Sequence, residues 1–380
     1  MNFDNEASVL HHFAGITDPR INRRRRHELL DIIVIALLGV MCGADSWAEI
    51  EEFGKAKHDW LQTFLALPNG IPSHDTFGRV FGRINPVEFR QCFQSWIQAV
   101  ATVTEGQVIA IDGKTLRGSI DKFLGKTAIQ MVSAWASGNH MVLGQVKVND
   151  KSNEITAIPQ VLRLLAVKGC IVTIDAIGCQ KDIAQAIVEA GGDYVLAVKG
   201  NQEHLYDELT ELFTCAEEDH YVEVEHDECR VVSKGHGRLE VRRGWTITDP
   251  DYLRYIRERA AWPKLSTLAF IEYERHEGEK VTTIRRFYIS SLTGSARQIV
   301  DAVRYHWSIE NNLHWVLDVA FGEDRSRVRK DYGPENLAVL RHIALNLAKQ
   351  DKTTKIGIKG KRLKAGWDND YLLHLLLGGN

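Results

Sequence analysis

The chain changes character at residues 107–112, which read QVIAID and open a series of short apolar segments. Two more segments of the same kind follow, AIQMVSAWA at 128–136 and MVLGQVKVN at 141–149. Each is rich in apolar or β-branched residues, and glycine or polar residues separate it from the next. This pattern predicts three successive β-strands.

After the third of these strands, predicted helices and strands alternate. Pro159 stands where a first helical residue would be and Gly169 where a helix would stop, which predicts a helix between them. The strand CIVTID at 170–175, a helix at 181–190 and the strand DYVLAV at 193–198 follow. The order β-β-β-α-β-α-β is that of the ribonuclease H fold, an α/β fold with a mixed sheet in which the first and fourth strands are neighbours.

Two acidic residues stand at the ends of strands that this fold makes neighbours. Asp112 ends the first predicted strand and Asp175 ends the fourth. Their carboxylates would repel each other unless a cation lies between them, so the pair predicts an oxygen-ligand site for Mg²⁺ or Mn²⁺. A single Asp at a strand end more often caps a turn, but the two together on this topology favour the metal site.

A third acid is expected from a helix that packs on the sheet. Ser295 and Gln298 form a capping-box pattern, and a helical apolar pattern continues from there to Gly322. The face expected to meet the sheet carries Glu310 among Val303, Trp307, Leu313 and Leu317. An inward carboxylate needs a partner, which is either a metal ion or a histidine of a structural network, His306 or His314. Asp324 is the main alternative as third ligand.

Residues 1–103 are predicted to form an all-α N-terminal domain. Apolar periodicity predicts helices at 29–40 and 47–67, and Ser73 is a candidate cap for a further helix. The short connection between the last two is compatible with a DNA-binding helix-turn-helix and equally with a simple helical packing domain. An arginine cluster before the first helix indicates either DNA-phosphate contacts or a solvated helix entry: Arg23, Arg24, Arg25 and Arg26.

Residues 203–292 are predicted to form a largely β insertion, because the core fold does not need them and they contain β-like runs. The first part, 203–228, holds eleven acidic residues and no Lys or Arg, and a basic stretch follows it. Five side chains there are candidates for DNA-backbone contacts, with a solvated hairpin as the alternative: Lys234, His236, Arg238, Arg242 and Arg243. Lys199 and Asn201 follow the fifth strand at the edge of the two acids and are further candidates.

Composition limits the remaining classes of function. The formal net charge of −3 and a pI of about 6.6 show no overall basic surplus, so DNA binding has to rest on local charge. The six cysteines form no CxxC pair and no secretory leader is visible, so we expect neither a zinc ribbon nor a disulfide framework, and we expect a cytoplasmic location. The most apolar stretch, 29–43, is too short to span a membrane, and no membrane association is expected.

Several separated segments resemble those of bacterial insertion-sequence transposases of the DDE superfamily, above all the H-repeat-associated transposases found beside Rhs elements. They are VIAIDGKTLRGS at 108–119, IVTIDAIGCQKDIA at 171–184, DYVLAVKGNQ at 193–202, KGHGRLEVRR at 234–243 and RYHWSIENNLHWVLDVAFGED at 304–324. The segment PSHDTFGRVF at 72–81 extends the likeness to the N-terminal part, so the resemblance spans nearly the whole chain.

The resemblance implies a DDE triad at Asp112, Asp175 and Glu310 that binds Mg²⁺ or Mn²⁺, with two ions expected. It also implies a catalytic domain at 104–380, with 203–292 inserted in it, and DNA-end binding by 1–103. The expected partners are double-stranded DNA with terminal inverted repeats and a second copy of the chain, as a homodimer on DNA. Lys114, which follows the first acid, is an expected DNA contact.

The wider signature around the third acid is only partly present. Relatives place Tyr, Arg and Lys at offsets of −7, −4 and +7 from the Glu, where this chain has Val303, His306 and Leu317. Arg325 and Arg327 are therefore candidate substitutes as DNA contacts. Two other functions stay open: a ribonuclease H-like nuclease that never joins strands, and a catalytically inactive DNA-binding remnant. The three intact acids speak against the remnant.

Overall fold

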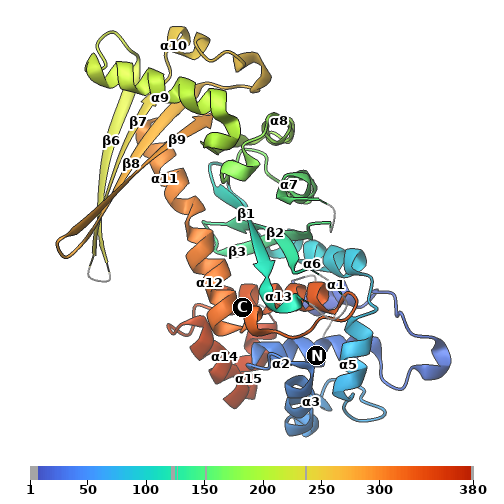
Figure 1. Ribbon diagram of the computed structural model, residues 1–380. Coiled ribbons are helices and arrows are strands. Elements are labelled where there is room, and N and C mark those ends of the chain that lie inside the picture. Colours follow the sequence, from blue (N-terminus) through green and yellow to red (C-terminus); the bar gives the residue numbers. More distant parts are fainter. Residues whose placement is uncertain (1–6, 121–124, 126, 150–151, 236–237, 378–380) are drawn as a thin grey trace.

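A nine-stranded mixed sheet forms the centre of the computed structural model, which describes residues 7–120, 125, 127–149, 152–235 and 238–377 (Figure 1). The strand order is β3-β2-β1-β4-β5-β9-β8-β7-β6. The strands are β1 Val108–Leu116, β2 Ile129–Ala136, β3 Met141–Lys147, β4 Ile171–Ile174, β5 Asp193–Val198, β6 His226–Gly235, β7 Arg238–Ile247, β8 Thr267–Glu277 and β9 Lys280–Ser290. This confirms the predicted α/β class with a ribonuclease H-like mixed sheet.

Helices flank the sheet and form the whole N-terminal region. The first group is α1 Val9–Phe13, α2 Leu29–Met41, α3 Trp47–Ala56, α4 His58–Leu61, α5 His74–Phe81 and α6 Pro86–Val100. The second group is α7 Glu154–Leu162, α8 Lys181–Glu189, α9 Glu203–Glu218 and α10 Pro250–Arg254. The last group is α11 Ala296–His306, α12 Trp315–Ala320, α13 Gly333–Gln350, α14 Ile358–Trp367 and α15 Asn369–Leu376. Among the described residues, no helix combines the length and apolar character needed to cross a membrane.

Strand β1 lies between β2, to which it is antiparallel, and β4, to which it is parallel. The first and fourth strands are therefore neighbours, as predicted. The parallel ladder ends at the pair Ile111 and Ile174, whereas the pairing with β2 continues to Leu116. Asp112 thus lies inside β1, and the expectation that it ends the strand was wrong. Asp175 does follow the last residue of β4.

Helix α13 joins the N-terminal helices to the sheet. It is buried along nearly its whole length, with α2, α5 and α6 on one side and β3 on the other. The Asn336 amide donates to the carbonyls of Phe81 (2.8 Å) and Ile84 (3.1 Å) at the end of α5. Asn346 exchanges two hydrogen bonds of 2.9 Å with the backbone of Val142 in β3. These buried amides hold α13 in one register between the two parts.

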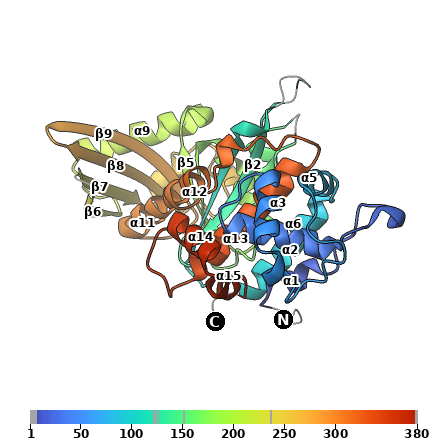
Figure 2. The same cartoon turned by 90° about the horizontal axis from the view of Figure 1, so that it is seen from below.

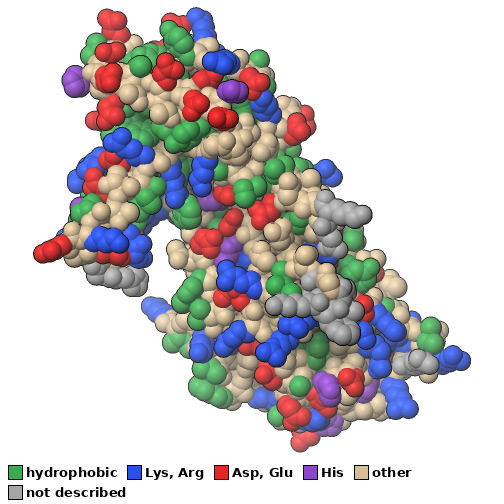
Figure 3. Space-filling view, in the orientation of Figure 1, with side chains coloured by type: hydrophobic (Ala, Val, Ile, Leu, Met, Phe, Trp, Pro, Cys, Tyr) green, Lys and Arg blue, Asp and Glu red, His purple; other side chains and the backbone are tan. Residues whose placement is uncertain are grey.

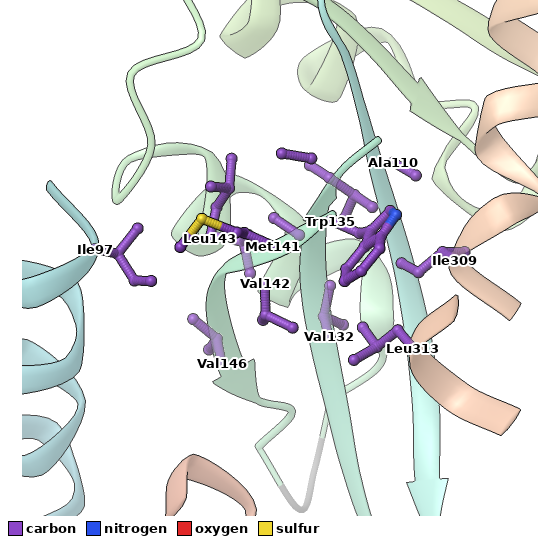
Figure 4. Close-up of a cluster of buried hydrophobic side chains, with 14 of the residues drawn as sticks. Ile97, Ala110, Val132, Trp135, Met141, Val142, Leu143, Val146, Ile309 and Leu313 are labelled. Atoms are coloured by element: carbon purple, nitrogen blue, oxygen red, sulfur yellow. The ribbon is translucent and has the colours of Figure 1, made fainter. Parts of the chain in front are cut away.

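The apolar core is continuous from the N-terminal helices to the C-terminus. Figure 4 shows part of it, where Ile97 of α6 faces strands β2 and β3 and where Ile309 and Leu313 approach Trp135 from the other side. The Trp135 side chain is fully buried. Burial of a large aromatic side chain contributes roughly 2–3 kcal/mol to the free energy of unfolding. The contacts of Trp135 therefore stabilise the packing of the Ile309–Leu313 segment on the sheet.

Strands β6–β9 form an arm that continues the central sheet (Figure 1). β9 pairs antiparallel with β5, so residues 203–292 add to the sheet of the core instead of forming a separate one. Helix α9 covers one face of the arm, where Phe213 packs on Phe270 and Phe287. Helix α11 covers the other face, and Gly244 of β7 leaves room there for Val300. Figure 3 shows a notch between the tip of the arm and the body.

Two predicted helices have different limits in the structure. The helix expected to start at Pro159 is α7, which starts at Glu154 and holds Pro159 in its interior. An interior proline removes one backbone hydrogen bond, and the buried side chains of Ile158 and Val161 offset that loss by packing. The helix expected at 47–67 is interrupted, with α3 ending at Ala56 and a short α4 following.

Candidate metal and catalytic centre

The two aspartates of the predicted site lie on neighbouring strands. Ile111 of β1 is paired with Ile174 of β4, and the next residue on each strand is Asp112 and Asp175 respectively. The Asp175 Oδ1 atom accepts hydrogen bonds from the backbone N–H groups of Ile177 (3.1 Å) and Gly178 (3.4 Å). Asp175 is therefore the cap of a short turn as well as a neighbour of Asp112.

Glu310 approaches the same edge from the helical segment after α11. Among the described residues, Asp112, Glu310 and His314 form a cluster whose potential ligand atoms all lie within 4.8 Å of one another. His314 Nδ1 is 3.5 Å from Asp112 Oδ2 and 3.5 Å from Glu310 Oε2. Asp175 is not part of this cluster. Asp324 lies elsewhere, in the turn after Gly322, with its Oδ2 3.6 Å from Arg117 Nε.

A π-helical turn sets the position of Glu310 and His314. α11 ends at His306, and residues Glu310–His314 form a π-turn before α12 begins. A π-turn widens the helix locally and changes which side chains share a face, and such turns occur often at functional sites. Trp307, just before this turn, is 43% exposed, so the expectation that it buries its apolar surface against the sheet was wrong, whereas Ile309 is fully buried.

The electrostatics of the cluster favour a bound cation. The pKa of Asp112 is raised to about 7, chiefly by burial and in part by the neighbouring Glu310 and Asp175, while His314 acts in the opposite direction. The pKa of Glu310 is lowered, chiefly by its hydrogen bond with His314. A buried carboxylate that resists ionisation gains most from a positive partner. Two carboxylates and an imidazole nitrogen are a donor set that suits a divalent cation such as Mn²⁺ or Mg²⁺.

Comparison with known proteins agrees with this geometry. The family model described as "Transposase DDE domain" matches residues 104–347, and the one described as "DDE_Tnp_1-associated" matches residues 10–97. The chain belongs to the DDE transposase family. The Escherichia coli protein named "H repeat-associated putative transposase YhhI" is 40% identical over 377 residues, which are 97% of this chain and 98% of that protein. "Putative transposase YncI" of the same species is 40% identical over 370 residues, covering 97% and 94%.

Sequence patterns did not assign two residues of this DDE family member, His314 and Glu154, to the candidate metal centre. His314 had been weighed only as a structural partner of Glu310, at a helical spacing of four residues. Glu154, the first residue of α7, places its carboxylate against Gly113, next to Asp112. Burial raises the pKa of Glu154, and Asp175 adds to the effect. The mistaken start of α7 at Pro159 had concealed this acid.

A small hollow of about 70 Å³ lies beside Asp175. Lys199, His306 and Trp307 line it, as does Arg286, whose guanidinium stacks 4.5 Å above the Trp307 ring. Burial lowers the pKa of His306 to about 4, so this imidazole is neutral at physiological pH and its Nδ1 lies 3.1 Å from Thr173 Oγ1. The structure thus places Lys199 next to Asp175. Asn201 instead holds the turn after that residue, by donating to the Ala176 carbonyl at 2.6 Å.

The remaining predicted DNA-binding residues are spread over the surface. Arg325 and Arg327 are exposed after α12, and Lys234 is exposed on the arm, where Arg238 lies 3.5 Å from Glu240. In the N-terminal cluster, Arg25 pairs with Asp18 at 3.2 Å, and the exposed members are Arg23, Arg25 and Arg26. The side chain of Arg24 and the whole of His236 lie outside the described part of the chain.

Lys114 has a different place from the one expected for a DNA contact. Its side chain is only 10% exposed and forms ion pairs with Asp318 and, at 3.5 Å, with the buried Glu323. It also donates to the His314 carbonyl at 3.3 Å. Lys114 therefore links β1 to the segment that carries the centre, because its charge balances two acids there.

We expect the variant Lys114→Met to unfold at lower urea concentration than the wild type, with a loss of about 2–4 kcal/mol. The reason is that it leaves the buried Glu323 with only Arg341, whose Nη1 is 3.8 Å away, as a cationic partner. The exposed Lys355 provides the control, since Lys355→Met removes the same charge without opening a buried pair. Equal urea midpoints for the two variants would contradict this role of Lys114.

Proposed function

We propose that this chain is a transposase that cuts and joins DNA strands at the ends of an insertion-sequence-like element, in a metal-dependent reaction. One observation carries the proposal: within a member of the DDE family, Asp112 lies beside Asp175 on neighbouring strands and beside Glu310 in space. Residues 1–103 act as the DNA-end-binding part in this proposal. Residues 104–380 are the catalytic part, with 203–292 as its insertion.

Asp112, Asp175 and Glu310 hold Mg²⁺ or Mn²⁺ in the proposed mechanism, and two ions are expected. When bound, such ions supply an activated water or 3′ hydroxyl and stabilise the leaving oxygen of the phosphodiester. His314 keeps Asp112 and Glu310 close together, since its Nδ1 lies between their carboxylates. Lys199, beside Asp175, is positioned to contact a phosphate oxygen of the same DNA strand.

The proposed partners follow from the family and from the sequence resemblance. They are double-stranded DNA with terminal inverted repeats and a second copy of the chain that brings two DNA ends together. The proposed location is the cytoplasm, where the chain reaches chromosomal DNA.

The proposed function is tested by incubating the purified protein with end-labelled DNA that carries the flanking ends of its own element. Separate reactions contain Mg²⁺, Mn²⁺ or no divalent metal. We expect cleavage at the element ends and joined products, both only with metal. Cleavage without joined products would indicate a nuclease, and DNA binding without cleavage would indicate an inactive remnant.

A further inference from the structure

Four basic side chains line an open hollow between α5 and the segment that leaves the candidate centre. The hollow measures about 530 Å³. Arg79 contributes from α5, and Arg327, Arg329 and Lys330 contribute from the segment before α13. Figure 2 shows this orange-red segment beside α3 and α5. The hollow therefore lies where the N-terminal helices meet the DDE domain.

A second open hollow, of about 700 Å³, adjoins the first. Arg83 lines it, two residues beyond the end of α5 and four residues after Arg79. The residues that line the two hollows are near neighbours in the chain, and the Tyr332 N–H of the second hollow donates to the Gly82 carbonyl just after α5 at 3.2 Å. We call the surface that carries their exposed cations the basic groove and define it by Arg79, Arg83, Arg327, Arg329 and Lys330.

The charges of the basic groove are not balanced by the protein. All five side chains are exposed, and within the described ranges none of them forms an ion pair. Of the acids lining the two hollows, Asp45 is engaged by Arg362 at 2.9 Å, which leaves Asp75 and Asp331 against the five cations. Unpaired like charges repel one another, so binding of an anion in the groove lowers its electrostatic free energy.

The arm offers a contrast, because most of its arginines are paired with glutamates. Arg243 contacts Glu272 at 2.9 Å, Arg285 contacts the same glutamate at 3.0 Å, and Arg275 is paired with Glu277. A cation that already has a carboxylate partner releases little free energy on meeting a phosphate. The basic groove is therefore the stronger electrostatic attractor of the two surfaces.

The position of the groove suits DNA that is bound at the centre. The Arg329 Nε donates to the Gly118 carbonyl at 3.1 Å, and Gly118 is only six residues beyond Asp112 along β1 and the turn after it. At ~3.3 Å per extended residue, this path is at most ~20 Å long. Duplex DNA rises ~3.4 Å along its axis per base pair, so that distance corresponds to at most about six base pairs.

We infer that the basic groove binds the sugar-phosphate backbone of duplex DNA, about half a helical turn from the phosphodiester that reacts at Asp112. The inference rests on the proposed function and adds a specific surface to it. One DNA end lies across both family regions, because Arg79 and Arg83 come from the N-terminal helices and the other three cations come from the DDE domain. The groove reads no bases, since Arg and Lys contacts to phosphate are independent of sequence.

The test compares the salt dependence of DNA binding, without divalent metal, for three proteins. They are the wild type, the triple variant Arg79→Gln, Arg83→Gln, Lys330→Gln, and a control with the same charge change near α10, Arg254→Gln, Arg257→Gln, Lys264→Gln. Fluorescence anisotropy with a duplex of roughly 30 base pairs gives the slope of log affinity against log salt. Each phosphate contact contributes about 0.9 to the slope, so the triple variant should lose about 2–3. At ~0.15 M salt, the affinity of the triple variant for DNA should fall on the order of 100-fold. The affinity of the control should stay within about twofold of the wild type.

An unchanged slope in the triple variant, beside a steep wild-type slope, would overturn the groove and leave the proposed function intact. A flat wild-type slope would instead count against DNA as the substrate, and so against the proposed function. Circular dichroism and thermal melting check that the variants fold. If the triple variant does not, the single variant Arg83→Gln takes its place, with an expected slope loss of about 1.

Discussion

The variant Asp112→Asn should lose metal-dependent cleavage by about 10³-fold or more while DNA binding changes little. Asn preserves the shape of the side chain but removes the charge that holds a divalent cation, and such an ion contributes several kcal/mol to the transition state. Asp175→Asn should behave in the same way. Cleavage of labelled element ends by either variant at a near-normal rate would refute the assignment of these carboxylates.

The same variant should be more stable than the wild type when metal is absent and the pH is high. The pKa of Asp112 is raised from 3.8 to about 7 in the folded protein, so the fold disfavours its charged form. Wild-type stability is then lost as pH rises from about 4 through about 7, whereas Asn carries no charge at any pH. We expect Asp112→Asn to be more stable by about 2–4 kcal/mol at pH 8 and equally stable near pH 4.

Thermal melting with and without divalent metal measures this effect. Added Mn²⁺ should raise the melting temperature of the wild type, because a ligand that binds only the folded state stabilises it. Added Mn²⁺ should change the melting temperature of Asp112→Asn little. A wild type more stable than the variant in metal-free buffer at pH 8 would show that burial of this carboxylate costs nothing.

The second prediction with a large expected effect decides whether Glu310 or Asp324 is the third acid of the centre. Glu310→Gln should lower the rate of metal-dependent cleavage by about 10³-fold, because the Glu310 carboxylate belongs to the cluster with Asp112 and His314. It should change stability little, since the side chain is 53% exposed. Urea unfolding alongside the cleavage assay separates the two effects.

Asp324→Asn serves as the matched comparison, because it also replaces a carboxylate by an amide near the end of the same helical segment. Among the described residues, its ion-pair partner is Arg117, whose side chain is 79% exposed, and such a pair contributes less than about 1 kcal/mol. We expect cleavage to fall less than about tenfold in this variant. Full loss of cleavage in Asp324→Asn, with activity kept in Glu310→Gln, would assign the third position to Asp324.

Much of the fold was predictable because local patterns carry it. The apolar runs at 107–112 and 170–175 predict strands, and the order of elements makes these strands neighbours. The helix limits were less predictable: Pro159 is tolerated inside α7 because buried neighbours offset the lost hydrogen bond. That error concealed Glu154. The helical pattern predicted neither the π-turn at Glu310–His314 nor the exposure of Trp307, which lies just before that turn.

Motif spacing and residue periodicity are local properties of the chain, and they were enough to predict the family, the β-β-β-α-β-α-β order and the candidate acids. The role of each charged side chain became clear only from the folded structure. Lys114 is only two residues from Asp112, yet it turns inward to Asp318 and Glu323, which are about 200 residues away in the chain. Arg79 and Arg329 are equally remote from each other and line one groove. The energy of a charge depends on its neighbours in space and on its burial, and folding alone brings those neighbours together.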